Sequence, residues 1–138
     1  MPTSNASEAD LTEVLAGAVR SAAAERRVLE IRGAGTRAGQ GRLVAGEPLE
    51  TAGHRGVVAY DPAELVLTAR AGTPLAEIEA LLEANGQMLA FEPPRFGPGG
   101  TLGGAVASGL SGPRRPFTGA LRDYVLGVRV LNGRGEVL

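Results

Sequence analysis

The chain contains no cysteine and only one histidine, His54. Without thiols it forms no disulfide, and it has no thiolate nucleophile, cysteine-ligated zinc or iron–sulfur cluster of its own. A single imidazole also argues against a histidine-based metal site. We therefore expect neither a metal site nor thiol chemistry in this chain.

Aromatic residues are scarce, and neither sign of charge is in excess. Phe, Trp and Tyr make up 4% of the chain, which removes the stacking platforms that single-strand-binding proteins use. Lys and Arg number 14 against 15 Asp and Glu, so no strong field attracts nucleic acid or anionic lipid. The composition therefore excludes a dedicated nucleic-acid-binding protein.

Long hydrophobic runs are also missing. No stretch approaches about 18 consecutive apolar residues, and the polar N-terminus has no apolar run behind basic residues. We expect a soluble, cytoplasmic protein without direct membrane insertion. A chain of 138 residues, 43% of them hydrophobic, can bury one core, in a single domain or in two tightly coupled lobes.

The apolar patterns predict helices alternating with short strands. An apolar stripe over residues 11–22, after a capping-box pattern at 7–10, predicts a first helix. Thr73 as cap, Pro74 in the first position and Gly86 at the end predict a second. The expected strands are 28–31, 49–51, 57–60, 65–69, 87–91 and 124–131, with 57–60 antiparallel to 65–69, and Asn132-Gly133 is expected as a hairpin turn before a return strand at 136–138.

Glycine is abundant, with 21 residues, and it is clustered. The first cluster follows the strand expected at 28–31, and its candidate binding residues are Gly33, Ala34, Gly35, Thr36 and Arg37. Consecutive N–H groups after a buried strand form a concave donor set that suits a phosphate, and the threonine and arginine add a hydroxyl and a charge. The alternative is an ordinary tight turn. The cluster is not a Rossmann fingerprint, because position 38 is not glycine.

In the second cluster, glycine occupies seven of the sixteen residues from 97 to 112. Its candidate binding residues are Gly99, Gly100, Thr101, Leu102, Gly103 and Gly104. They combine a glycine pair, a hydroxyl cap and the start of a short helix near Thr101, where free N–H groups and partial positive charge converge. The alternative is close helix packing without a ligand. Two donor sets about 65 residues apart suggest one doubly charged ligand, such as the pyrophosphate of a dinucleotide.

No other polar residue is assigned a catalytic role. Arg114 and Arg115, in the sequence Gly-Pro-Arg-Arg-Pro, could face the same anion or a partner subunit, or could form a solvated turn. His54 is expected at the surface, since no neighbour in the sequence would orient it. The glutamates of the second helix are expected on its exposed face.

A family resemblance rests on segments spread over the chain. They are residues 54–58, 60–62, 64–66, 72–75, 85–89, 92–94, 103–104, 109–116 and 122–127. Together they resemble the FAD-binding subunits of glycolate oxidases, in the flavin family typified by vanillyl-alcohol oxidase and p-cresol methylhydroxylase. The likeness spans about residues 28–138, and the Gly-Pro-Arg-Arg-Pro sequence at 112–116 is fairly specific to this subunit type.

The resemblance implies an α+β, two-lobed FAD-binding domain of the p-cresol methylhydroxylase (PCMH) type. The first lobe would cover about residues 1–92, and residues 93–138 would begin a second lobe that is truncated here. Residues 33–37 match the family's first pyrophosphate loop, and 99–104 with Ser108 and Gly109 match the second. Members with covalent flavin use a histidine or cysteine beside these loops, and this chain has neither there. FAD would therefore be held non-covalently, and the missing wall would weaken its retention.

The function implied by the resemblance is that of an FAD-binding subunit of a complex that oxidises glycolate or another 2-hydroxy acid. A catalytic flavin subunit and an iron–sulfur subunit would be its partners, and through them it could lie at the inner membrane. The chain would support electron transfer without being catalytic alone, since the sequence shows no base that could deprotonate the substrate. The alternative is a cofactor-free scaffold domain of such a complex, and a third option is an oxidase that turns over glycolate by itself.

Overall fold

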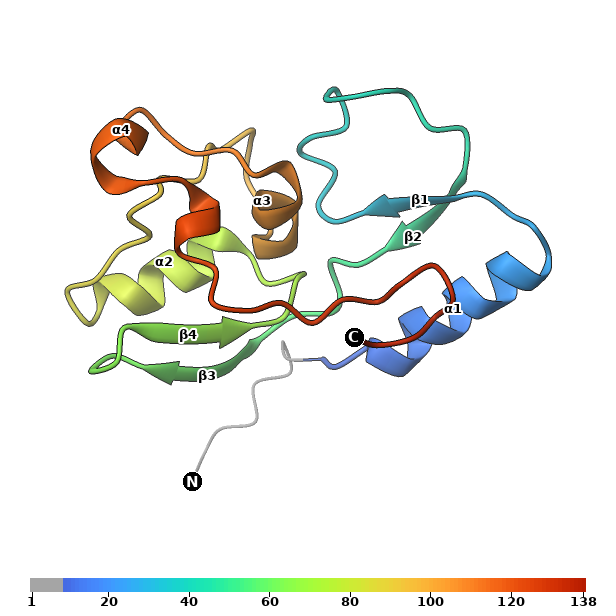
Figure 1. Cartoon of the computed structure of the whole chain (residues 1–138), viewed down its shortest axis with the longest axis horizontal. Coiled ribbons are helices and arrows are strands. Elements are labelled where there is room, and N and C mark those ends of the chain that lie inside the picture. The colour runs from blue at the N-terminus through green and yellow to red at the C-terminus, as the bar shows by residue number, and fades with distance from the viewer. Residues whose placement is uncertain (1–8) are drawn as a thin grey trace.

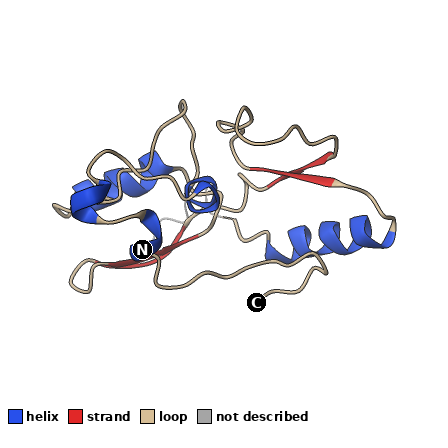
Figure 2. Cartoon of the chain, turned by 45° about the horizontal axis from the view of Figure 1, so that its top comes forward, coloured by secondary structure: helices blue, strands red, loops and turns tan. Residues whose placement is uncertain are grey.

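The computed structural model describes residues 9–138. The described chain forms, in order, α1 (Thr12–Ala24), β1 (Leu29–Arg32), β2 (Glu47–Glu50), β3 (Val57–Asp61), β4 (Val66–Ala69), α2 (Leu75–Glu83), α3 (Leu102–Ser108), α4 (Arg115–Thr118) and a 3-10 turn at Leu121–Asp123 (Figure 1). Helices and strands occupy separate parts of the chain and do not alternate as βαβ units (Figure 2). The α+β class predicted from the sequence is confirmed.

The first sheet is a parallel pair. β1 and β2 run in register from Leu29 opposite Glu47 to Arg32 opposite Glu50. Parallel strands need a connection of a dozen or more residues, and the long loop at 33–46 provides it without a helix. The first glycine cluster therefore begins directly where β1 ends, as predicted.

The second sheet is the predicted antiparallel hairpin of β3 and β4. The side chain of Asp61 sets its turn, because Oδ1 accepts the N–H groups of Ala63 at 3.0 Å and Glu64 at 3.2 Å. Leu65 completes the turn with a left-handed φ of 58°.

The main core lies where α2 and α3 meet. Leu75 of α2, Ala105 of α3, Phe91 and Leu121 form one buried cluster. The prediction that Thr73 caps α2 with Pro74 in the first helical position is wrong by one residue, since Pro74 is itself the N-cap. The hydroxyl of Thr73 is buried and joins the start of α2 to the start of β3, because it accepts the N–H of Gly56 at 2.9 Å.

The start of α1 differs from the capping-box prediction. Ser7 lies outside the described residues, and the helix begins at Thr12. The N-cap residue is Leu11, and Asp10 just before it binds the first helical residue, because its Oδ1 accepts the N–H of Thr12 at 3.0 Å and the hydroxyl of the same residue at 2.7 Å. These bonds lower the pKa of Asp10 to about 2.

The strand predicted at 87–91 does not form in the described chain. Gln87 uses its side chain instead, accepting the Tyr60 hydroxyl at 2.8 Å and donating to the Pro62 carbonyl at 2.8 Å. Glu92 then takes a left-handed φ of 49°, which turns the chain away from any ladder. Phe91 is buried by packing rather than by strand pairing.

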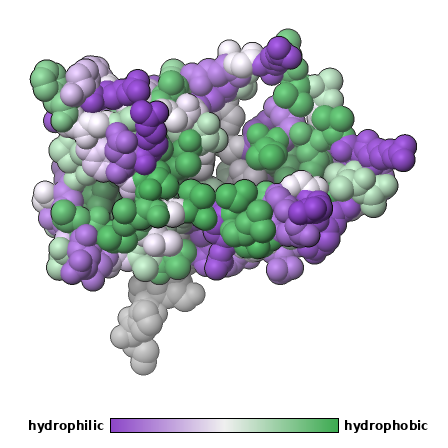
Figure 3. All heavy atoms as spheres, viewed as in Figure 1, coloured by the Kyte–Doolittle hydropathy of each residue, from purple (hydrophilic) through white to green (hydrophobic). Residues whose placement is uncertain are grey.

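The strand predicted at 124–131 is also absent from the described residues, although this segment follows an open course across the molecule (Figure 1). A strand needs a partner, and within the described residues only the end of this segment has one: Val130 and Leu138 exchange N–H···O bonds of 3.0 and 2.8 Å, and Leu131 forms an antiparallel bridge with Val137. The return segment at 136–138 therefore pairs as predicted, and the turn before it contains Asn132 and Gly133, as predicted, with Gly135 at a φ of 74°. Leu126 and Val128 are 81% and 61% exposed, and Figure 3 shows apolar side chains gathered across this face.

None of the helices within residues 9–138 has the length and apolar character needed to cross a membrane.

Candidate functional site

The two glycine clusters lie against each other in the folded chain (Figure 1). A methyl carbon placed on Gly33 would lie 2.9 Å from the Thr101 hydroxyl oxygen, closer than folded proteins tolerate. A methyl carbon on Gly99 would lie 3.7 Å from that of Ala34. Segments about 65 residues apart in the sequence therefore share one small region, as the diphosphate hypothesis requires.

The first loop offers backbone donors that the chain does not use. None of the N–H groups of residues 33–37 donates to another described residue. Gly35 has a φ of 69°, a left-handed value that glycine adopts without strain and that bends the loop here. These residues are half-buried or exposed, so their N–H groups are accessible to a ligand, and a run of consecutive open donors beside a strand end suits an anion.

The second loop differs from the prediction, since the N–H groups at the start of α3 are not free. Leu102 donates to the Thr73 carbonyl at 2.9 Å, and Gly103 donates to the Ala71 carbonyl at 2.7 Å. Gly104 donates to the Thr101 hydroxyl at 3.2 Å, so Thr101 is the predicted N-cap. The donors left open among the described residues are the N–H groups of 99–101, just before the helix.

Glycine at 103 serves close packing. A methyl carbon on Gly103 would lie 2.7 Å from the Ala71 methyl and 2.9 Å from the Ala71 carbonyl oxygen. Leu102 packs against the buried cluster around Leu75. The alternative drawn from the sequence, in which glycine allows close packing without a ligand, therefore describes Gly103. At Gly35 and Gly99 glycine is needed for a different reason, because both have a positive φ.

Arg37 stands where both loops meet. Its Nη2 donates to the Pro94 carbonyl at 3.2 Å, and its guanidinium carbon lies 5.2 Å from the centre of the Phe96 ring. A methyl carbon on Gly104 would lie 3.2 Å from Nη1. Nε is buried without a hydrogen-bond partner among the described residues.

The charge on Arg37 is left without a carboxylate partner in the described chain. Burying a donor of a charged group without a partner costs about 1–3 kcal/mol, so such a group calls for a specific explanation. An anion held between the two loops would provide it. Pro94 and Phe96 were missed by the sequence reasoning, although the Pro-Pro-Arg-Phe-Gly-Pro run marks a segment without regular structure.

Ser108 and Gly109 lie at the far end of α3. The Ser108 hydroxyl donates back to the Ala105 carbonyl at 3.0 Å, and Gly109 ends the helix with a φ of 61°. Seven helical residues rise about 10 Å, so this end stands roughly that far from Thr101. Within the described chain neither residue hydrogen-bonds to the first loop, and the partial negative charge of a helix C-terminus disfavours an anion there.

The Gly-Pro-Arg-Arg-Pro arginines also lie away from the glycine loops. Arg114 pairs with Glu92 at 2.9 Å, and this contact lowers the pKa of the Glu92 carboxyl. Arg115 borders a surface hollow of about 400 Å³ with Leu121 and Val125. This hollow is also lined by Gly109, but neither it nor another of about 430 Å³ beside Met88 is lined by residues 33–37 or 99–104.

His54 is more enclosed than expected. Its side chain is 19% exposed, and Nδ1 accepts the N–H of Leu11 at 3.0 Å. Burial lowers the pKa of His54, opposed by Asp10 and assisted by Arg70. The expectation of a surface residue is wrong, because contact with the start of α1 could not be seen in the sequence.

Similarity to known proteins shows the family of this chain. Residues 7–138 match a protein family described as FAD binding domain. Glycolate oxidase subunit GlcE of Escherichia coli is 50% identical over 131 residues, which cover 95% of this chain and 37% of that protein. Mitochondrial D-lactate dehydrogenase (cytochrome) 1 of Saccharomyces cerevisiae is 27% identical over 82 residues, 59% of this chain and 14% of that protein. The chain thus spans well under half the length of these curated relatives.

Proposed function

The chain belongs to the FAD-binding domain family, and on that premise we propose that it holds the diphosphate of FAD between its two glycine loops. The observation that carries this proposal is the contact of Gly33 with Thr101, which places the open amides of 33–37 beside those of 99–101. Backbone donors converging from two segments suit a diphosphate, whose oxygens need several donors at once.

Each part of the site has a separate role in this proposal. The N–H groups of 33–37 and 99–101 and the Thr36 hydroxyl would bind phosphate oxygens, and Arg37 would add a charge. Leu102, Gly103 and Gly104 would fix the helix against its neighbours rather than touch the ligand. Ser108 and Gly109 would close the helix.

The proposal also includes two lobes that are coupled to each other. We expect a first lobe to about residue 92 and the start of a second over 93–138, incomplete here. The buried cluster joins Leu75 and Phe91 to Ala105 and Leu121, which lie on opposite sides of residue 92. Because the two parts share this core, they would move together rather than as independent domains.

By its likeness to GlcE, the chain would serve as the FAD-binding subunit of a complex that oxidises glycolate or a related 2-hydroxy acid. When bound, FAD supplies the hydride and electron chemistry. The chain's own residues bind and orient the cofactor, and a catalytic flavin subunit and an iron–sulfur subunit are the expected partners. The protein would be cytoplasmic, reaching the inner membrane only through those partners.

The flavin would be held without a covalent bond. The sequence has no cysteine, and the one histidine, His54, is occupied by the N–H of Leu11. Neither a cysteine nor a free histidine therefore borders the two loops in the described chain.

Purification of the full-length gene product tests the proposal. We expect the absorbance of oxidised flavin, full release of the flavin on acid precipitation, and its identification as FAD. A product that binds neither FAD nor FMN on titration, while a sister subunit does bind flavin, would favour the scaffold function instead.

The scaffold function remains the second candidate because of one observation. Gly103 is required by its packing on Ala71, with no ligand involved. The same titration separates the two candidates, since a scaffold would bind its partner subunits with or without FAD. The third option, an oxidase acting alone, predicts glycolate turnover by the isolated chain.

A further inference from the structure

Residues 93–99, here called the coupling segment, connect the turn at Glu92 to the second glycine loop. The segment contains Pro93, Pro94 and Pro98, and within the described chain it makes no backbone–backbone hydrogen bond. Arg95 pairs with Glu79, and the segment is otherwise held by contacts to side chains from elsewhere. Segments with so few backbone bonds lie at the low-stability end of a fold.

Arg37 is the contact between the coupling segment and the first glycine loop. Its Nη2 bonds the Pro94 carbonyl at 3.2 Å, and its guanidinium lies over the Phe96 ring at 5.2 Å. Phe96 is 45% exposed, so this stacking is a large part of what fixes the ring in place. One guanidinium therefore holds both the backbone and the aromatic side chain of the segment.

The same guanidinium has further N–H groups that face away from the coupling segment. Nε is buried and has no partner among the described residues, and Nη1 lies beside Gly104 at the start of α3. A planar guanidinium can bond two acceptors in fixed directions, which a lysine ammonium cannot do. An anion at the glycine loops and the Pro94 carbonyl can thus be bound at once.

From this geometry, and resting on the proposed function, we propose that Arg37 is a positioning residue that couples occupancy of the diphosphate site to the order of the coupling segment. A bound diphosphate fixes the guanidinium, and the fixed guanidinium holds Pro94 and Phe96. The coupling segment then forms a third wall of the site. A ligand without a diphosphate does not produce this effect.

Hydrogen exchange with three probes tests the coupling. FAD and ADP, which share the diphosphate, are expected to slow exchange of the amides of residues 95–97, which do not themselves bind the ligand, about tenfold or more. Riboflavin, which has no phosphate, is expected to leave them unchanged. Protection by riboflavin equal to that by FAD would contradict the proposal, because the flavin ring and not the diphosphate would then order the segment.

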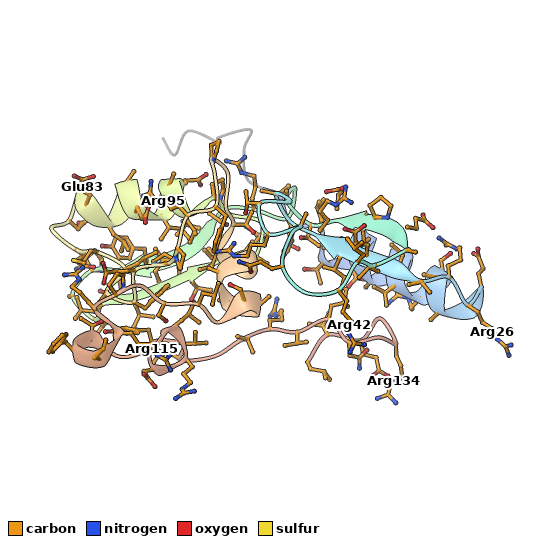
Figure 4. All side chains as sticks on the ribbon, turned by 90° about the horizontal axis from the view of Figure 1, so that it is seen from above. Arg26, Arg42, Glu83, Arg95, Arg115 and Arg134 are labelled. Atoms are coloured by element: carbon orange, nitrogen blue, oxygen red, sulfur yellow. The ribbon has the colours of Figure 1, made fainter. Side chains whose placement is uncertain are left out.

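Substitutions at Arg37 separate its charge from its geometry. Arg37→Gln is expected to weaken FAD binding about 10- to 100-fold and to abolish protection of residues 95–97 even at saturating FAD. Arg37→Lys keeps the charge, so we expect it to regain part of the affinity without the protection. Arg42→Gln is the matched control, since Arg42 is exposed and extends outward from the same loop (Figure 4).

Phe96→Ala removes the ring that Arg37 holds while keeping the backbone donors and Arg37 itself. The ring is half exposed, so its loss should leave the fold intact while reducing the protection that FAD gives. Wild-type protection in both Arg37→Gln and Phe96→Ala at saturating FAD would overturn the coupling and leave FAD binding standing. A wild-type chain that binds neither FAD nor ADP would instead overturn the proposed function together with the coupling.

Discussion

Gly103 shows how little room the site region leaves for a single methyl group. The carbon of Gly103→Ala would lie 2.7 Å from the Ala71 methyl and 2.9 Å from its carbonyl oxygen, and backbone cannot move aside cheaply. We expect a loss of about 1–3 kcal/mol in the free energy of unfolding, measured by urea denaturation. The control is Gly17→Ala in α1, where nothing lies within 4 Å and the better helix propensity should add up to about 1 kcal/mol. Equal stability of the two variants would contradict this packing.

His54 gives the chain a pH-dependent attachment of α1. The folded state lowers the pKa of His54 below its unfolded value of about 6.5, because burial and the bond from Leu11 N–H favour the neutral ring. The stabilisation is therefore complete above pH 6.5 and is lost as the pH falls below it. We expect the free energy of unfolding to decrease by about 0.5–1.5 kcal/mol between pH 7.5 and 5.5.

His54→Asn is the matched variant for this prediction. The amide oxygen of asparagine can accept the Leu11 N–H but does not titrate, so stability at pH 7.5 should be kept and the slope between pH 7.5 and 5.5 should disappear. Since the chain has one histidine, a slope that persists in His54→Asn would show that another group causes it.

For single residues, the sequence predicted which loops come together but not every contact that their residues make. The run of open N–H groups at 33–37 follows from glycines placed directly after a strand, and this pattern can be recognised from neighbouring residues alone. The open donors expected at the start of α3 could not be judged locally, because the carbonyls of Ala71 and Thr73 that occupy them come from a distant segment. The place of Arg37 against Pro94 and Phe96 depends on the same long-range packing.

Among the elements, α3 depends most on one cap. Thr101 is 4% exposed, and its hydroxyl accepts the Gly104 N–H while lying against Gly33. Thr101→Ala should lower the free energy of unfolding by about 1 kcal/mol and weaken FAD binding, because the second loop loses its anchor. Thr101→Ser keeps the hydroxyl and should restore most of both. Denaturation and FAD titration of the pair measure this, and full FAD affinity in Thr101→Ala would argue against a positioning role for α3.

Elements with local signals were predicted well, and those that need a distant partner were not. The β3–β4 hairpin forms its own ladder around the Asp61 turn, and α2 ends at Gly86 with a left-handed φ of 67°, as predicted. Residues 87–91 and 124–131 have apolar patterns of the same kind. An apolar pattern indicates burial or an apolar face, but a strand also requires a ladder with a neighbouring backbone. Within the described chain 87–91 and 124–129 have no such ladder, and only Val130 and Leu131 pair, with residues 137–138.

For the whole molecule, the account depends on long-range convergence. The loop after β1 and the loop before α3 come from different parts of the chain, yet they touch at Gly33 and Thr101. No charge excess draws a ligand to this place, because the chain carries a net charge of −1. Recognition would therefore come from the open amides and one arginine, and the affinity for FAD should depend on salt only weakly.

Backbone amide NMR of the isotopically labelled chain during FAD addition tests the central claim most directly. If both loops bind the same diphosphate, the amide signals of residues 33–37 and 99–101 shift together and give one dissociation constant. ADP should shift the same signals, and riboflavin should not. Shifts confined to one of the two loops, or two loops with different dissociation constants, would contradict a single diphosphate held between them.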